Sequence, residues 1–307
     1  MGKEKNSFER RKKLSVSDKI FFAVTYTVFI LLALICIYPF YYLVINTVSR
    51  NDYVDLGMVM YRPIGFHLQN YVNIFKLDNV LNALFISVSR TVLGTAFPVF
   101  FTTVLAYLFT KQHMKHRKLL YRMTIITMYF SAGMIPIYMN IKMLGLLNNY
   151  WVYIIPGLIR VYNLVLVKTF IESLPAALEE SAQIDGAGYV RRFLHIILPL
   201  SKPILATVAL FSAVSAWNSY MDTLLYITDS SLYTLQFTLY EYLNQATSIA
   251  SSINSMTDVS ALDKATQIST TSVRNTMAVV TIIPIICVYP FIQRYYVQGV
   301  MIGAVKG

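Results

Sequence analysis

Long stretches that are almost free of charged side chains are the feature that most restricts how this chain can fold. Six of them occur in the 307 residues, separated by more polar connections. Crossing about 30 Å of hydrocarbon takes about 20 apolar helical residues, and a helix satisfies its own backbone hydrogen bonds in lipid. The sequence therefore predicts an all-α membrane protein with six transmembrane helices. These span about Ile20–Ile45, Leu81–Phe109, Met123–Met139, Trp151–Thr169, Pro203–Ile227 and Asn275–Gln293.

The composition excludes an ordinary water-soluble domain. The chain is 56% hydrophobic and only 13% charged, which leaves too little polar surface to cover a soluble protein of this length. Its net charge of +11 does not indicate nucleic-acid binding, because the basic residues lie at the ends of apolar runs. The first run is too long for a cleavable signal peptide, and no small-residue cleavage site follows it. We therefore expect this run to remain as a helix.

The distribution of Lys and Arg predicts the orientation, because these residues accumulate in cytoplasmic connections. They are concentrated in the N-terminal tail and again in the connection between the second and third runs. We therefore expect a basic cytoplasmic tail over residues 1–19, a transmembrane domain over residues 20–307, and both termini in the cytoplasm. The loops expected outside are residues 46–80, 140–150 and 228–273, of which the last contains helical patterns over 232–246 and 258–266.

A polar insert, residues 174–203, separates the fourth and fifth runs and is expected on the cytoplasmic side. Pro175 suits the first turn of a helix, and strong helix formers follow it, so we expect a helix over residues 175–183. Asp185-Gly186 then breaks this helix, since glycine tolerates turn conformations that other residues resist. A second, amphipathic helix over residues 189–197 completes a bent hook. Its predicted faces are Val190, Phe193, Leu194 and Ile197 against Arg191, Arg192 and His195.

The spacing within this insert resembles a known motif. Glu180-Ser181-Ala182 is followed after three residues by Gly186, and after nine more by Ile196 and then Leu198-Pro199. This pattern is similar to the cytoplasmic EAA motif of permease subunits in binding-protein-dependent ABC importers, with Ser181 in place of the usual alanine. The resemblance implies the type I importer permease fold and a coupling helix that docks on a separate ATPase. The residues to which it assigns this role are Glu179, Glu180, Ser181, Ala182, Asp185, Gly186 and Ala187.

Segments outside the insert resemble the carbohydrate-uptake branch of these permeases, the second-permease type for oligosaccharides or complex glycans. They are Tyr38-Pro39-Phe40, Ala216-Trp217-Asn218, and the ending Pro290–Gly299 with Gly303–Gly307. The resemblance implies a multi-pass protein of the bacterial cytoplasmic membrane, surrounded by lipid, that imports sugar by alternating access. Its implied partners are a homologous second permease, an ATP-binding subunit dimer that holds ATP and Mg, and an extracytoplasmic sugar-binding protein. No cofactor and no nucleic acid is expected on this chain itself.

Several residues within the predicted spans are candidates for the substrate pathway. Arg90 and Arg160 are charged, and charge inside a membrane is costly enough to suggest a function, although either residue could pair or reach the membrane surface. Aromatic rings and amides suit sugar rings, but a Trp in a span more often packs or anchors it. The remaining pathway candidates are Tyr129, Asn140, Trp217, Asn218 and Tyr220.

Two other classes of function stay open. An ion-coupled secondary transporter should carry paired acids or broken helices within its spans, and the only acid found there is Asp222. A membrane-embedded enzyme should show a catalytic constellation, and none is evident: no residue is a candidate for catalysis, and the histidines lack metal-ligand spacing. The sequence also lacks a P-loop, so ATP hydrolysis must occur in a partner. Within its last outer loop, the Ser/Thr-rich part could be a spacer or could reach a docked binding protein.

Overall fold

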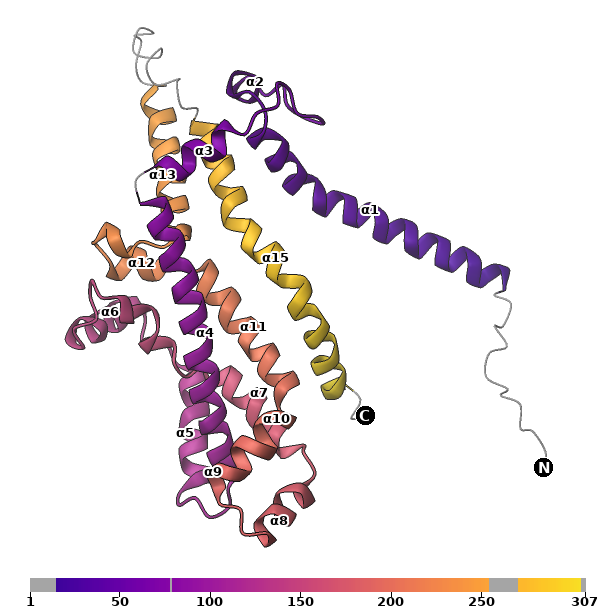
Figure 1. Cartoon of the computed structure of the whole chain (residues 1–307), viewed down its shortest axis with the longest axis vertical. Coiled ribbons are helices and arrows are strands. Elements are labelled where there is room, and N and C mark those ends of the chain that lie inside the picture. The colour runs from indigo at the N-terminus through magenta and orange to yellow at the C-terminus, as the bar shows by residue number, and fades with distance from the viewer. Residues whose placement is uncertain (1–14, 78, 254–269, 305–307) are drawn as a thin grey trace.

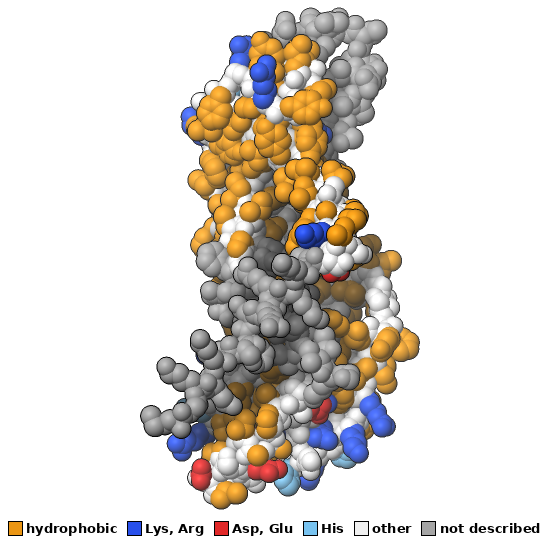
Figure 2. Space-filling view, turned by 90° about the vertical axis from the view of Figure 1, so that its right-hand side faces the viewer, with side chains coloured by type: hydrophobic (Ala, Val, Ile, Leu, Met, Phe, Trp, Pro, Cys, Tyr) orange, Lys and Arg blue, Asp and Glu red, His pale blue; other side chains and the backbone are white. Residues whose placement is uncertain are grey.

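The computed structural model describes residues 15–77, 79–253 and 270–304, and within these ranges every regular element is helical. Long helices run side by side along the vertical axis of Figure 1, and the hook forms the lower end. Figure 2 shows hydrophobic side chains over much of the upper half of one face, Lys and Arg at the upper end, and charged side chains of both signs gathered at that lower end. This distribution suits a molecule whose middle lies in lipid and whose ends lie in water.

The first predicted span is helix α1, Val16–Thr47. It diverges from the other helices in Figure 1, and only its last three residues are buried. It contacts helix α15, Thr270–Ala304, which is the sixth predicted span. Because nearly all of α1 is apolar and exposed, lipid or another membrane protein must cover it. Two short helices follow it, α2 (Asn51–Asp55) and α3 (Gln69–Lys76).

The second predicted span is helix α4, Val80–Thr110, and it is central to the packing. It contacts α7 (Val161–Glu172) and α11 (Lys202–Asn218) along its length. One buried apolar cluster joins the lower parts of these three helices around Tyr107, Leu164 and Val208. Helix α15 lies against α11 on the other side.

The third predicted span is not one continuous helix. Helix α5, Arg117–Tyr129, ends before residues 130–133, and α6, Met134–Met143, follows them. Gly133 has a φ of +85°, a conformation that interrupts an α-helix. The single helix expected over residues 123–139 is therefore wrong: hydropathy reports apolar length and does not detect a backbone break within it.

The fourth and fifth predicted spans are also interrupted. Two 3-10 turns, η1 (Tyr150–Tyr153) and η2 (Ile155–Gly157), precede α7 at an angle of 46°. Helix α11 ends at Asn218, and a separate helix α12, Met221–Tyr226, follows. In the described part of the chain, three helices are long and apolar enough to cross a membrane. The number rises to five if each of two bent helix pairs is one span, so six spans stay a prediction.

The segment expected as the last outer loop contains a helix that packs on the bundle. After a 3-10 turn η4 (Ser230–Leu232), helix α13 extends over Leu235–Ile253 and contacts α4 and α15. This confirms the helical pattern predicted over residues 232–246. The second pattern, over residues 258–266, lies outside the described residues. Asn82, near the beginning of α4, donates to the backbone carbonyl of Ser231. This hydrogen bond holds η4 against the first turn of α4.

Candidate functional site

The first limb of the hook is helix α8, Ala176–Ile184, which confirms the helix predicted there. Pro175 precedes it, and the carbonyl of this proline accepts the amide hydrogen of Leu178 at 3.2 Å. No residue of α8 is buried, and Ile184 at its end is 86% exposed. The helix therefore has no apolar core of its own to hold it in place.

Gly186 makes the turn that ends this helix. Its φ is +76°, in the left-handed region that residues with a Cβ rarely adopt. The amide of Gly186 donates to the Gln183 carbonyl at 3.1 Å, and the Ala187 amide donates to the Ala182 carbonyl at 2.9 Å. A Cβ added at Gly186 would meet no atom within 4 Å. The backbone conformation, and not crowding, therefore requires glycine at the predicted break.

The second limb begins with helix α9, Tyr189–Arg192, and continues through a π-helical turn η3, Phe193–Ile197, into α10, Leu198–Leu200. The next helix, α11, starts at an angle of 78° to this limb. The limb is helical as predicted, and its apolar end joins the buried cluster between α4 and α7. The 78° bend thus connects the hook directly to α11.

The faces predicted for the second limb are partly wrong. Phe193 and Ile197 are buried as expected, but Val190 is 71% exposed and Leu194 is 46% exposed. Arg192, expected on the polar face, is 6% exposed. An acidic side chain from the first limb lies beside it and offsets the cost of its burial. Helical periodicity cannot detect that partner, because it comes from another helix.

That partner is Glu179, and three donors converge on its Oε1 atom. The Lys111 ammonium forms an ion pair with it, the Tyr107 hydroxyl donates to it at 2.9 Å, and Arg192 Nη1 lies 3.5 Å away. Arg192 Nη1 also donates to Gln183 Oε1 at 2.9 Å, which ties the second limb back to the first. Burial lowers the pKa of Lys111, and its bond to Glu179 opposes this. The carboxylate thus links α4, α8 and α9.

Glu180 lies one residue further along and is exposed, with no polar bond to another side chain of the described residues. Ser181, Asp185 and Gly186 are also exposed, while Ala182 and Ala187 are half-buried. The Ser181 hydroxyl donates to the carbonyl of Leu178 at 3.3 Å and so stays within its own helix. The structure therefore brings the predicted coupling residues onto one short hook, but it separates the two acids. Glu179 turns toward the bundle, and Glu180 turns away from it.

Arg90, one of the two intramembrane arginines, is bound inside the protein. It forms an ion pair with Asp222 of α12, donates to the Ser219 carbonyl at 2.9 Å, and lies 4.5 Å from the centre of the Tyr153 ring. Its side chain is 3% exposed. This geometry favours a structural role that ties α4 to the break between α11 and α12. It also engages the only acid that an ion-coupled transporter could use in these predicted spans.

Arg160, the other intramembrane arginine, is exposed at the junction between η2 and α7. No ion pair or side-chain hydrogen bond joins it to any other described residue. Its neighbour Tyr162 is 54% exposed. A guanidinium at a bend in an apolar segment is available to a ligand, another subunit or a lipid headgroup.

Trp217 is a packing residue. It is 7% exposed, joins an apolar cluster with Met277 and Val280, and donates from Nε1 to the Thr281 carbonyl at 3.1 Å. Its side chain is therefore engaged within the bundle. This agrees with the alternative interpretation from the sequence, in which a Trp within a span packs against other helices. The pathway role suggested for Trp217 stays without support in this geometry.

Asn218 and Tyr220 lie nearby at the end of α11, and both are accessible. The Asn218 Oδ1 accepts from Gln236 Nε2 at 3.2 Å, and Tyr220 stacks on Tyr240 with ring centroids 4.8 Å apart. We call these four residues the aromatic-amide cluster. Gln236 and Tyr240 were missed in the sequence, although their spacing of four on a predicted helix places them on one face. Such a cluster can bond and stack on a sugar ring.

Tyr129 and Asn140 do not join that cluster. Tyr129 ends α5 and is 77% exposed, and Asn140 is exposed on α6. No hydrogen bond or ring contact connects either residue to Asn218 or Tyr220. The five uncharged candidates for the pathway are therefore dispersed over the fold, and the structure brings only Asn218 and Tyr220 together on an accessible surface.

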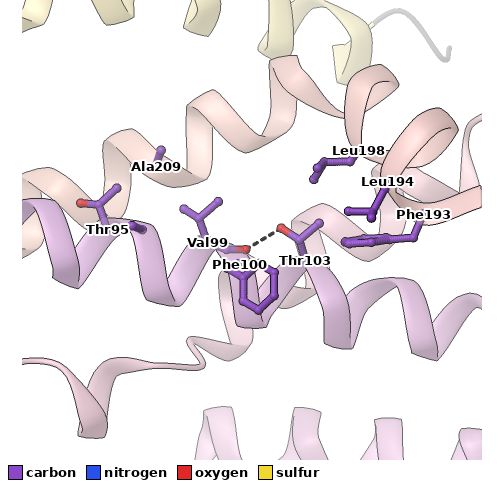
Figure 3. A pocket seen from close by; sticks show the side chains of 9 residues that line it. Thr95, Val99, Phe100, Thr103, Phe193, Leu194, Leu198 and Ala209 are labelled. Atoms are coloured by element: carbon purple, nitrogen blue, oxygen red, sulfur yellow. Dashed lines mark hydrogen bonds between the residues drawn. The ribbon is translucent and has the colours of Figure 1, made fainter. Parts of the chain in front are cut away.

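An open apolar cavity of about 280 Å³ lies where the second limb meets α4 and α11 (Figure 3). Phe193, Leu194 and Leu198 line it from the limb, and Val99 and Phe100 line it from α4. The nearby Thr103 hydroxyl is bound to the carbonyl of Val99 at 2.6 Å. The lining is almost entirely apolar, so the cavity offers a sugar few hydrogen-bonding groups.

Within the described ranges no three His, Cys, Asp or Glu side chains gather in a way that could hold a metal ion. Cys36 and Cys287 are both free and exposed. What the arrangement does offer is surface for binding: an exposed hook, a bent apolar bundle and accessible polar groups at its breaks.

Comparison with known proteins assigns this arrangement to a family. Residues 75–302 match the family model described as "Binding-protein-dependent transport system inner membrane component". The chain is 35% identical over 292 residues to the polygalacturonan/rhamnogalacturonan transport system permease protein YtcP of Bacillus subtilis, covering 95% of this chain and 100% of that one. It is 38% identical over 273 residues to protein LplC of the same organism, covering 89% and 90%.

A solved structure shares the fold. It is a chain in the crystal structure of a bacterial ABC transporter involved in the import of the acidic polysaccharide alginate. The two chains superpose with a TM-score of 0.81 at 28% identity, covering 92% of this chain and 99% of that one. The two chains therefore share one fold over nearly their full lengths.

Proposed function

Because this chain belongs to the family of binding-protein-dependent transport system inner membrane components, we propose that it is the sugar-translocating permease of an ATP-driven importer. The observation that carries this proposal is the match of residues 75–302 to the family, joined to full-length similarity with sugar permeases. The absence of a P-loop in the sequence supports the view that a separate subunit binds ATP and Mg. The chain itself is thus a conduit and not an enzyme.

The proposed route of coupling is the hook. Its exposed first limb presents Glu180, Ser181 and the turn at Gly186 to the cytoplasmic side, and its second limb continues into α11 through the 78° bend. An ATPase dimer that binds the first limb would therefore transmit its movement to α11, because no flexible linker separates the hook from that helix. Alternating access follows if movement of the hook also moves the helices joined to it. The outer segment around α13 would then separate from the partner permease and open the pathway to the outside.

The proposed cargo is an oligosaccharide, with acidic glycans the first class to test. One similar permease carries polygalacturonan or rhamnogalacturonan in its name, and the similar solved structure concerns alginate. Arg160 supports this choice, because an exposed guanidinium in an apolar segment suits a carboxylate on a passing sugar. The aromatic-amide cluster supports contact with the uncharged parts of the same ligand.

A second permease is the partner that α1 supports. This helix of 32 residues is apolar and exposed over most of its length, and it diverges from its own bundle. A homologous subunit could pack along it and could face Arg160 across a shared pathway. A sugar-binding protein on the outer side would deliver the ligand, which the family's description as a binding-protein-dependent transport system supports.

One purification tests these proposals together. The chain, tagged and produced with its candidate ATPase and second permease, should retain both through purification in detergent. Reconstituted with a binding protein, the complex should show ATPase activity that rises with acidic oligosaccharides more than with neutral ones. Arg160→Gln should reduce uptake of the acidic glycans by about tenfold and change neutral uptake little. Loss of both partners, or no stimulation by any glycan, would contradict the proposed function.

A further inference from the structure

The position of α8 depends on polar contacts. This helix buries no residue, so apolar packing does little to hold it against the membrane-spanning bundle. In the described chain, Glu179 and Gln183 are its only side chains with polar bonds to another helix. Both of them meet Arg192 of the second limb, and only Glu179 also reaches α4. A single carboxylate thus connects the exposed limb to a spanning helix.

The low solvent exposure around Glu179 strengthens its ion pairs with Lys111 and Arg192. Its side chain is 22% exposed, and those of Lys111 and Arg192 are 14% and 7% exposed. Ion pairs that are shielded from water in this way are weakened less by salt than those on an open surface. The Tyr107 hydroxyl adds a hydrogen bond to the same oxygen, and the Lys111 ammonium lies 3.9 Å from the centre of the Tyr107 ring. Among the residues that the structure describes, the two cations have no other acid within ion-pair distance.

The neighbouring acid has the opposite environment. Successive residues of an α-helix are rotated by about 100°, so Glu179 and Glu180 leave the axis in different directions. Glu180 is exposed and is free to meet another protein, whereas Glu179 is engaged within this chain. The pair therefore presents one acid outward and one inward on the same turn.

We propose that Glu179 is a positioning residue that locks α8 to the cytoplasmic end of α4 and to α9. Force applied to the exposed side of α8 then reaches α4 through the carboxylate, in addition to reaching α11 through the chain. Without this contact the hook could still bind an ATPase. Movement of α8 would then bend the chain at Gly186 and would not be transmitted to α4. This inference rests on the proposed coupling role of the hook and assigns a separate task to one of its two acids.

The test compares Glu179→Gln with Glu180→Gln in the reconstituted complex. Glu179→Gln removes the charge and keeps the shape, and we expect the ATPase to copurify while transport per ATP hydrolysed falls about tenfold. Glu180→Gln should instead reduce the amount of ATPase that copurifies. Glu172→Gln is the matched control and should change neither quantity. Glu172 also pairs with a lysine, Lys168, but within α7, and its side chain is 44% exposed.

Measuring the distance between α8 and α4 distinguishes a loss of positioning from a general loss of folding or assembly. Spin labels at Ile184, at the end of α8, and at Leu108, near the end of α4, occupy exposed sites, with Cys36 and Cys287 replaced by serine. We expect one narrow distance distribution in the parent and in Glu172→Gln, and a broad one in Glu179→Gln. A narrow, unshifted distribution in Glu179→Gln together with unchanged transport per ATP would overturn the inference.

A milder variant keeps the test decisive if Glu179→Gln does not assemble. Tyr107→Phe removes the hydroxyl that donates to Glu179 and retains the ring, which packs against Phe193 with centroids 5.1 Å apart. It should lower transport per ATP severalfold at normal yield, and an unchanged ratio would overturn the inference. If Glu179→Gln and Glu180→Gln both leave assembly and transport intact, the proposed coupling role of the whole hook is wrong.

Discussion

At the scale of single residues, burial decides what an ionic group can do. Arg90 and Arg160 look alike in the sequence, since each is a lone arginine in an apolar environment. The structure encloses Arg90 between Asp222, Ser219 and Tyr153, and leaves Arg160 exposed at a bend. The first arginine is therefore part of the framework, and the second is available to a ligand.

The pair formed by Arg90 and Asp222 gives an asymmetric prediction. Asp222→Leu leaves a guanidinium that is 3% exposed without a counter-charge, which should destabilise the protein by about 3 kcal/mol. Arg90→Met leaves a carboxylate that is 38% exposed, so its effect should be smaller. The double variant should recover part of the loss, because neither charge is then left unpaired.

Thermal unfolding of the purified complex in detergent measures all three variants. The expected order of midpoints is the parent, then Arg90→Met, then Asp222→Leu, with the double variant above Asp222→Leu. A lower midpoint for Arg90→Met than for Asp222→Leu would show that Asp222 depends on Arg90, and would contradict this account.

At the scale of elements, the hook depends on one backbone conformation. Gly186 has a φ of +76°, whereas Gly188, two residues later, has a φ of −66° that any residue adopts. Neither glycine would bring an added Cβ within 4 Å of another atom. The two positions therefore differ in backbone strain and not in available space.

This difference predicts that Gly186→Val impairs the hook and that Gly188→Val does so much less. A left-handed conformation costs a residue with a Cβ about 1–2 kcal/mol, and a β-branched side chain increases the strain. Gly186→Val should reach the membrane normally but should lose most binding-protein-stimulated ATPase activity. Equal activity of both variants would show that the turn conformation does not matter for coupling.

At the scale of the whole molecule, the hook and η4 lie at opposite ends of α4. Lys111, just after α4, binds Glu179 of the hook, and Asn82, near its beginning, binds Ser231 of η4. The basic connection before α5 lies at the same end as the hook. Since Lys and Arg accumulate on the cytoplasmic side, that end should face the cytoplasm and η4 should face outward.

Cysteine labelling in intact cells tests this orientation. Ser230 and Lys115 are both exposed in the chain, so either position should react once a reagent reaches it. With Cys36 and Cys287 replaced by serine, Ser230→Cys should react with an impermeant maleimide in intact cells. Lys115→Cys should react only after the membrane is permeabilised. The reverse pattern would invert the orientation and would exclude the hook from contact with a cytoplasmic ATPase.

The sequence alone determined the membrane class, the apolar helices α1, α4 and α15, and the hook with its break at Gly186. Each of these rests on local chemistry: apolar length, helix propensity and the backbone freedom of glycine. The motif spacing in the hook also pointed to the family to which the chain belongs.

The tertiary structure alone decided how the charged groups are divided. Glu179 and Glu180 are neighbours in a motif, and only the approach of Lys111 and Arg192 turns one of them inward. The break within the third predicted span likewise follows from the backbone at Gly133 and not from hydropathy. Periodicity describes one helix at a time, whereas the partners of a buried charge come from residues distant in the sequence. Their identity therefore appears only when the chain has folded.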